Sequence, residues 1–276
     1  MIKRMLVPTD GSDMARRGVT YALALAEKHG ASIMALHVVD VKLLEGPFLR
    51  DISASLGTAP YVNYTGNISA LLEAHGASAL EEVERLCAER GIPCEATLAT
   101  GIVPRVIVET GALADLIVLG RGGEHSPWLE GLAGSTAQAV VRRASTPVLV
   151  TGAAAPEGDK VVVAYDGSPH ARKALRTGAD VAREWGMALH LVTVRADAEA
   201  VQGEALGYLE SRDGLEIVCV ARQGDAGEEI AAYAGESGAA VIVMGAFGHS
   251  KLRQLVVGST TAYVLHRAPC PLLLLH

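Results

Sequence analysis

Short apolar runs alternate along the chain with longer segments whose apolar residues recur at helical spacing. In the first half, the runs predict strands near 3–8, 31–38, 93–98, 115–120 and 146–151. The segments between them predict helices near 13–29, 68–90, 102–112 and 134–144. Strands that are apolar almost throughout and alternate with helices are typical of a parallel sheet covered on both faces. With right-handed crossovers, the pattern predicts an α/β fold built on a doubly wound sheet.

The second half of the chain repeats the pattern of the first. Its apolar runs predict strands near 160–165, 187–194, 215–221, 240–245 and 271–275, with four helices between them. An Asp-Gly-Ser tripeptide after the first strand recurs 156 positions later, from Asp10 to Asp166. A glycine-rich loop after the fourth strand recurs 125 positions later, from Gly120 to Gly245. The first half therefore contains 31 residues (156 minus 125) without a counterpart, and they fall between residues 40 and 75.

This repeat predicts two tandem domains, each a five-stranded parallel sheet of Rossmann-like order 3-2-1-4-5. We expect the first domain to span residues 1–152 and the second to span 160–276, joined by a linker of small residues and proline at 153–159. The insertion at 40–75 mixes Leu, Phe and Tyr with Gly and Pro, which suits a lid, a partner surface or a loop folded against its own domain. Since it follows the second strand directly, we expect it beside the ligand site of the first domain.

The composition narrows the classes of function. Half of the 276 residues are hydrophobic and 20% are charged, which indicates a substantial core rather than a disordered chain. The net charge of −7, without a basic stripe, argues against nucleic acid as a partner. No apolar stretch approaches the roughly 20 residues of a membrane span, so we expect no membrane partner. The four cysteines are scattered and form no CxxC motif, so we expect reduced thiols in the cytoplasm and neither a disulfide framework nor a zinc site.

Two repeated motifs meet at one edge of the predicted sheet. In the order 3-2-1-4-5, strands 1 and 4 are neighbours, and ligands bind at their carboxyl ends, where the winding reverses. Asp10 and Asp166 end the first strands, and Gly120 and Gly245 end the fourth strands. Glycines admit a ligand close to backbone N–H groups, and a serine at the start of the next helix adds a hydroxyl and the positive end of the helix dipole. This combination indicates a phosphate-containing ligand.

Each of these residues also has a purely structural interpretation. Asp-Gly-Ser is good turn chemistry, so either aspartate alone is explained as a turn or helix-cap residue. Gly120 and Gly123 are explained by close packing of a helix on a strand. Ser135 and Ser259 are expected to cap the helices that they open. For His125 and His249 the alternative is a solvated loop histidine, since no acid or nucleophile accompanies either. Because the aspartate and the glycine loop recur together in both halves, we favour ligand contact as well.

These motifs resemble those of the universal stress protein family in its tandem two-domain form, and the resemblance covers nearly the whole chain. ATP-binding members of the family carry Gly-2x-Gly-9x-Gly-(Ser/Thr) after the fourth strand. The second half has this spacing at Gly245, Gly248, Gly258 and Ser259. In the first half, ten residues rather than nine separate Gly123 from the Gly-Ser pair, so we expect the loop to bulge there.

The resemblance implies one ATP site in each domain. The aspartate would contact the adenosine, the backbone at the end of strand 2 would bind the adenine edge, and the glycines, the serine and the following threonine would hold the ribose and phosphates. In the first half, the expected contacts are Pro8, Thr9, Asp10, Val38, Gly120, Arg121, Gly123, Gly134, Ser135 and Thr136. In the second half, they are Ala164, Tyr165, Asp166, Val194, Gly245, Gly248, His249, Gly258, Ser259 and Thr260. Because Pro8-Thr9 becomes Ala164-Tyr165, we expect the two adenine pockets to differ.

The same resemblance implies a nucleotide-holding stress-response or signalling module, with Mg²⁺ carried by the phosphates of ATP. It also implies pairing of the two fifth strands within one chain, as an internal pseudo-dimer; a homodimer stays open, and no protein partner is indicated. Two alternatives are a slow ATPase or adenylate-forming enzyme on the same scaffold, and a dimerising interaction protein that binds no nucleotide. The chain contains neither a Walker Gly-x-x-x-x-Gly-Lys-(Ser/Thr) motif nor a Ser-Gly-Gly-x-Asp-Ser loop. We therefore assign no catalytic residue and no metal ligand, and expect ATP to be held rather than turned over by design.

Overall fold

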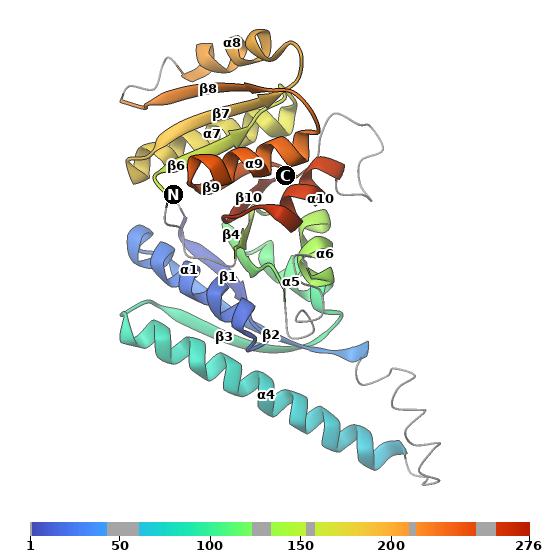
Figure 1. Cartoon of the computed structure of the whole chain (residues 1–276). Helices are drawn as coiled ribbons and strands as arrows, with labels where there is room; N and C mark the ends of the chain where they lie inside the picture. The colour runs from blue at the N-terminus through green and yellow to red at the C-terminus, as the bar shows by residue number, and fades with distance from the viewer. Residues whose placement is uncertain (1, 43–60, 123–133, 153–157, 210–213, 247–257) are drawn as a thin grey trace.

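The computed structural model describes residues 2–42, 61–122, 134–152, 158–209, 214–246 and 258–276, and it confirms the predicted α/β fold (Figure 1). The elements of the first half are β1 (Arg4–Pro8), α1 (Asp13–His29), β2 (Ser32–Asp40), α4 (Tyr61–Glu89), β3 (Cys94–Gly101), α5 (Val103–Gly111), β4 (Leu116–Gly120), α6 (Ser135–Arg143) and β5 (Val148–Thr151). Those of the second half are β6 (Lys160–Ala164), α7 (Pro169–Trp185), β7 (Ala188–Val194), α8 (Ala198–Leu209), β8 (Ile217–Arg222), α9 (Ala226–Ser237), β9 (Ala239–Gly245), α10 (Ser259–Arg267) and β10 (Leu272–Leu275).

Helix α4 differs most from its predicted bounds. It is a 29-residue helix that begins at Tyr61 rather than near residue 68, so residues 61–67, which were not predicted to be helical, form its first turns. The early part of this segment contains Asn, Gly and β-branched residues, which are weak helix formers. They extend a helix that stronger residues nucleate, and extension costs much less than nucleation. Residues 43–60 lie outside the described residues. Although α4 is long, no helix in the part of the chain that the structure describes is long and apolar enough to cross a membrane.

The strands form one ten-stranded sheet in the order β3-β2-β1-β4-β5-β10-β9-β6-β7-β8. Each half has the predicted order 3-2-1-4-5, and within each half the paired strands run parallel. The halves meet where β5 and β10 pair antiparallel, with Leu149 opposite Leu273. The two fifth strands thus pair within the chain, and Figure 1 shows the two halves on either side of this junction. The domain boundaries at residues 152 and 160 stay a prediction.

The junction strands are short, with four residues each, but all of their residues are buried. Leu149 and Leu273 belong to the hydrophobic cluster on the side of α1 and α7. Val150 and Leu274 belong to the cluster on the side of α6 and α10. Since alternate residues of a strand point to opposite faces, one pair of short strands joins the cores of both halves on both sides of the sheet.

The Asp-Gly-Ser turn after the first strand has the same geometry in both halves. Gly11 and Gly167 have φ angles of 76° and 80°, in the left-handed region where a residue with a Cβ is strained. Ser12 and Ser168 are the N-caps of α1 and α7, and each hydroxyl accepts a hydrogen bond from the backbone N–H three residues later. The turn therefore holds the aspartate before it at the carboxyl edge of the sheet.

Candidate functional site

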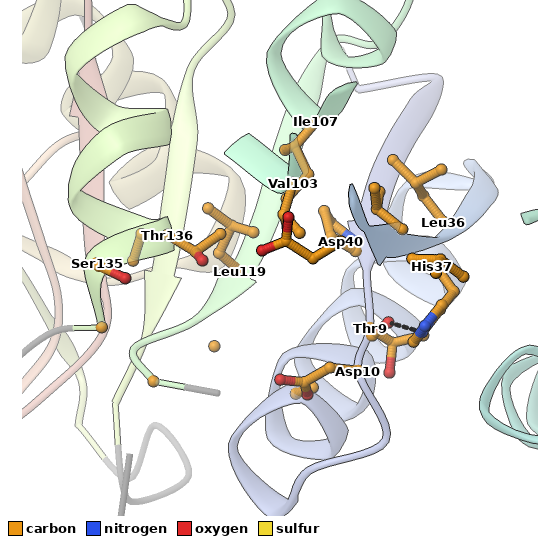
Figure 2. Close-up of a pocket in the computed structure, with 18 of the residues that line it drawn as sticks. Thr9, Asp10, Leu36, His37, Asp40, Val103, Ile107, Leu119, Ser135 and Thr136 are labelled. Carbon is orange, nitrogen blue, oxygen red and sulfur yellow. Dashed lines mark hydrogen bonds between the residues drawn. The ribbon is translucent and has the colours of Figure 1, made fainter. Parts of the chain in front are cut away.

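A cavity of about 390 Å³ lies at the carboxyl ends of β1, β2 and β4, in the first half of the chain. Figure 2 shows it between the end of β2 and the first turn of α6. The predicted contacts that line it are Pro8, Thr9, Asp10, Val38, Gly120, Gly134, Ser135 and Thr136. Lining residues that the sequence did not indicate include His37, Asp40, Leu72, His75 and Gly122, with an apolar wall of Leu36, Val103, Ile107 and Leu119. A volume of this order is typical of a small-molecule pocket.

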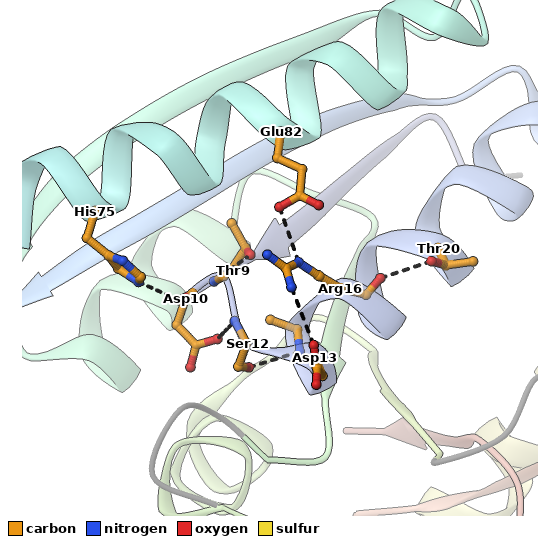
Figure 3. Close-up of polar contacts among 10 residues, drawn as sticks. Thr9, Asp10, Ser12, Asp13, Arg16, Thr20, His75 and Glu82 are labelled. Carbon is orange, nitrogen blue, oxygen red and sulfur yellow. Dashed lines mark hydrogen bonds and ion pairs between the residues drawn. The ribbon is translucent and has the colours of Figure 1, made fainter.

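Asp10 has both of the roles that its sequence motif suggested. Its Oδ1 accepts a hydrogen bond from the backbone N–H of Ser12 at 3.0 Å, which closes the turn (Figure 3). The N–H of Thr9 donates to the carbonyl of Leu36 at 2.8 Å and so continues the sheet one residue past β1. The turn interpretation of Asp10 is confirmed, and the same residue also lines the cavity.

Two histidines hold the backbone of this turn. Nδ1 of His37, in β2, lies 2.9 Å from the carbonyl oxygen of Thr9. Nε2 of His75, in α4, lies 3.1 Å from the carbonyl oxygen of Asp10, as Figure 3 shows. A carbonyl oxygen only accepts, so each of these ring nitrogens carries the proton. The end of the insertion, through Leu72 and His75, thus reaches the cavity of the first half.

Strand β2 continues past the end of β1 and forms the next part of the wall. Its pairing with β1 ends where Pro8 lies opposite Leu36. Its pairing with β3 continues to Asp40, opposite Gly101. Residues 38–40 therefore face the space beyond the end of β1, and Figure 2 shows the Asp40 carboxylate at the cavity. The sequence could have indicated Asp40, because residues i and i+2 of a strand share a face and Val38 was already a candidate.

The glycines that end β4 and β9 are required by packing. A Cβ on Gly120 would lie 2.4 Å from the carbonyl oxygen of Met14 in α1. A Cβ on Gly245 would lie 2.6 Å from the Cβ of His170 in α7. Both distances are shorter than atoms can approach without a shift of the structure, so the packing interpretation is confirmed for Gly120, and Gly245 meets the same requirement. The close approach also brings the start of α1 to the cavity, where Ala15 joins the lining.

Helix α6 begins at the cavity with an uncapped N-terminus. Gly134 occupies the N-cap position, Ser135 is the first helical residue, and no side chain caps the helix. Helix α10 begins in the same way, with Gly258 before Ser259. The expectation that these serines are N-caps is therefore wrong, because the extended glycine already turns the chain into the helix. The first N–H groups of α6 have no partner within the helix, and the positive end of its dipole lies at the cavity.

Arg121 lies next to the cavity wall, but its side chain points away from the cavity. Its carbonyl accepts a hydrogen bond from the N–H of Gly134 at 2.8 Å, which joins the end of β4 to the start of α6. Its Nη2 donates to the carbonyl of Cys270 at 3.3 Å, across the β5–β10 junction. Burial lowers the pKa of this guanidinium. The structure therefore places the Arg121 side chain at the junction, and Gly123 and His125 lie outside the described residues.

The second half has the same turn after its first strand, but different side chains hold it. Asp166 Oδ1 accepts from the N–H of Ser168 at 3.0 Å, as Asp10 does from Ser12. The carbonyl of Asp166 accepts from Nη1 of Arg195 at 3.1 Å. Two hydrogen bonds of 2.5 and 2.9 Å hold Arg195 on Asp197. Of the other predicted contacts, Val194 ends β7, Gly245 ends β9, and Gly258, Ser259 and Thr260 begin α10; Gly248 and His249 lie outside the described residues.

Tyr165 makes the end of β6 unlike the end of β1. The residue is 3% exposed and belongs to the hydrophobic cluster on the side of α1 and α7. Burial raises the pKa of its phenol. Thr9, at the matching position, accepts a hydrogen bond from the N–H of Gly11 through its hydroxyl at 3.2 Å. With Ala164 also buried, the two strand ends differ in shape and in hydrogen bonding.

Comparison with known proteins decides the family. The sequence pattern of the universal stress protein family matches residues 1–152, 158–214 and 195–276. The chain belongs to the universal stress protein family. The matches cover both halves, which confirms the tandem form. Universal stress protein Slr1230 of Synechocystis is 30% identical over 285 residues, which cover 99% of this chain and 99% of the relative.

Shorter and more distant relatives agree with this assignment. Universal stress protein MJ0531 of Methanocaldococcus jannaschii is 33% identical over 153 residues, which cover 54% of this chain and 82% of the relative. The crystal structure of a universal stress protein from Archaeoglobus fulgidus covers 99% of this chain and 97% of its own, with a TM-score of 0.70 and 21% identity. At that identity, the likeness shows that the two proteins share a fold.

Proposed function

We propose that this universal stress protein binds ATP in the first-half cavity and acts as a nucleotide-holding module in stress response or signalling. The observation that carries the proposal is the convergence of three features on one cavity: the turn at Asp10, the glycines Gly120 and Gly134, and the uncapped start of α6. The cavity thereby joins an apolar wall to a helix end that favours anions, and ATP uses both.

The apolar side of the cavity suits the adenine ring. Side chains from β2, α5 and β4 form this wall. Because β2 continues past β1, the backbone of Val38 faces the cavity and offers a donor and an acceptor for the adenine edge. The carboxylates of Asp10 and Asp40 lie on the polar side, where the ribose hydroxyls would donate to them.

The start of α6 suits the phosphates. The N–H groups of Ser135, Thr136 and Ala137 are among the first in the helix, and all three residues line the cavity. These N–H groups would act together with the hydroxyls of Ser135 and Thr136, and with the glycines that let the backbone pass close to the phosphates. Mg²⁺ would enter with the phosphates that carry it.

We propose a matching site in the second half, which gives one site per domain. It would use Asp166, Val194 and Gly245 with the start of α10, in the same frame that holds the first site. We also propose a cytoplasmic location, in keeping with four free thiols. Tyr165 and Arg195 support different affinities for the two sites, because Tyr165 changes the shape of the end of β6 and Arg195 replaces a histidine as the donor to the aspartate carbonyl.

The test measures nucleotide content and ATP affinity of the full chain. The purified protein is denatured and the released adenine nucleotide is counted; stripped protein is then titrated calorimetrically with Mg²⁺-ATP. Gly134→Val places a branched side chain at the start of α6, and Gly258→Val makes the matched change at α10. We expect wild-type protein to bind two nucleotides and each variant to bind one. Phosphate release in the same samples distinguishes holding from slow hydrolysis.

The outcomes separate the parts of the proposal. One nucleotide per chain, lost only in Gly134→Val, would restrict the function to the first half. Absence of adenine nucleotide and of any heat of binding, in wild-type protein that still unfolds cooperatively, would overturn the proposal and favour an interaction protein that binds no nucleotide.

A further inference from the structure

Two cysteines meet at the edge of the sheet, away from the cavity. Cys87 lies in the last turn of α4, and Cys94 begins β3, which is an edge strand. A tight turn joins them: Gly91 has a φ of 66°, and the N–H of Ile92 donates to the carbonyl of Cys87 at 2.9 Å. Both side chains belong to one cluster, with Cys87 buried in the core under α4 and Cys94 packed against it, so the two thiols lie within reach of each other across the turn.

The two thiols differ in access and in acidity. Cys87 is 0% exposed, in the hydrophobic cluster between α4 and the sheet, whereas Cys94 is partly exposed. The hydrogen bond from Cys87 lowers the pKa of Cys94, and the backbone of Ala35 adds to this against the opposing effects of burial and Glu84. The same hydrogen bond and burial raise the pKa of Cys87. The accessible sulfur is therefore the better nucleophile, and the buried thiol is held beside it as a neutral donor.

We propose that Cys87 and Cys94 form a peroxide-sensitive dithiol that closes to an intramolecular disulfide. The Cys94 thiolate attacks one oxygen of a hydroperoxide; an S–O bond forms, the O–O bond breaks, and the leaving oxygen takes a proton to become water or an alcohol. The Cys87 sulfur then attacks the Cys94 sulfur; an S–S bond forms, the S–O bond breaks, and the hydroxide takes the Cys87 proton and leaves as water. The hydroperoxide is the two-electron oxidant, and together the two cysteines lose two electrons and two protons.

Local structure allows this closure. Cys87 lies within the last turn of its helix, where a small adjustment disturbs few backbone hydrogen bonds. Cys94 is the first residue of its strand, so the sulfurs approach each other across one turn and the pairing of β3 with β2 can stay in place. The proposal is independent of nucleotide binding, because neither cysteine lines the cavity.

Cys219 provides a matched comparison within the same molecule. It lies on β8, the opposite edge strand of the sheet, and its side chain is exposed. Its immediate surroundings desolvate the sulfur enough to raise its pKa. If exposure alone governed reactivity, Cys219 would react before Cys94. Thiolate formation assisted by Cys87 predicts the reverse order.

The test treats reduced full-length protein with hydrogen peroxide and maps the alkylated peptides by mass spectrometry over time. We expect a Cys87–Cys94 disulfide to form several-fold faster than Cys219 is oxidised, because Cys94 ionises more readily and has a second thiol beside it. Cys87→Ser should prevent the disulfide and let dimedone trap a sulfenic acid on Cys94. Cys94→Ser should protect Cys87 from oxidation. Cys219→Ser is the control and should leave the disulfide unchanged.

Two results in wild-type protein would overturn the proposal, whether or not the variants fold. One is oxidation of Cys219 ahead of Cys94. The other is accumulation of sulfinic acid on Cys94 without a cross-link to Cys87, because a resolving thiol in contact should intercept the sulfenic acid first. Recovery of all four thiols with dithiothreitol would support the disulfide as the product.

Discussion

Nε2 of His75 lies 3.1 Å from the carbonyl oxygen of Asp10, although the two residues are 65 positions apart in the chain. In the second half, the equivalent carbonyl belongs to Asp166, and an arginine rather than a histidine binds it: Nη1 of Arg195 lies 3.1 Å from the carbonyl oxygen of Asp166. In one half the brace comes from helix α4, and in the other it comes from the residue that follows β7. The turn at the end of the first strand is thus held from outside in both halves, by side chains that the repeat does not share.

Replacing His75 with alanine should weaken ATP binding in the first half. The change removes a hydrogen bond that holds the turn, and a loss of about 0.5–1 kcal/mol in binding corresponds to roughly 2–5-fold in the dissociation constant. Because His75 is exposed, the free energy of unfolding should fall by less than about 1 kcal/mol. Calorimetric titration with Mg²⁺-ATP and urea unfolding measure the two effects. The control is Glu81→Gln, at an exposed residue of the same helix, which should change neither the ATP affinity nor the stability. Wild-type affinity in His75→Ala would show that the hydrogen bond from His75 does not support the site.

Gly11→Ala should destabilise the turn that presents Asp10. At a φ of 76°, a residue with a Cβ costs about 1–2 kcal/mol in urea unfolding. Asparagine tolerates this region better, so Gly11→Asn should lose less stability than Gly11→Ala. Gly167→Ala, at a φ of 80°, should lose a similar amount but leave ATP affinity in the first half unchanged. Equal losses for alanine and asparagine at Gly11 would argue against a backbone cause.

Leu274→Ala should destabilise the whole chain through the junction. Leu274 is 0% exposed and pairs with Val148 of the first half. Truncation of a buried leucine costs about 2–5 kcal/mol, and here the cluster that loses packing contains residues of both halves. We expect circular dichroism to show one urea transition with a lower midpoint. Leu113→Ala, at a residue that is 67% exposed, should stay within about 0.5 kcal/mol of wild type. An early transition that removes only half of the signal would contradict coupling of the halves.

His190 should make the protein less stable in mildly acidic solution. The residue is 8% exposed, and its Nδ1 lies 2.6 Å from the Tyr233 hydroxyl. Burial lowers its pKa below the usual 6.5, because the charged imidazolium would lose its hydration. As the pH falls, the unfolded state therefore takes up the proton first. The stabilising contribution is present above about pH 6.5 and is lost as the pH falls toward the folded pKa.

Urea unfolding at about pH 7.5 and about pH 5.5 measures this effect, since the two values bracket the unfolded pKa of histidine. His190→Gln keeps a polar side chain that does not titrate, so its stability should fall less between the two pH values than that of wild type. An equal fall in both proteins would assign the acid sensitivity to other groups.

Elements with local signals were predicted closely. Helix α1 was expected over 13–29 and spans Asp13–His29, because Ser12 caps its start and Gly30, at a φ of 63°, ends it. The start of α4 was missed because residues 61–67 resemble a loop in composition, and the helix there depends on the residues that follow. Strand order followed from the repeat and from the rules for parallel crossovers.

The sequence by itself determined the two-fold repeat, the α/β class, the turn at Asp10 and the glycine loop at Gly120, because each depends on residues that are close in the chain. Only the tertiary structure decided that His75 reaches Asp10, and that the side chain of Arg121 leaves the cavity for Cys270. Those contacts join distant segments. Their formation depends on the length and direction of α4 and on the antiparallel pairing of β5 with β10, which local hydrophobic periodicity does not specify.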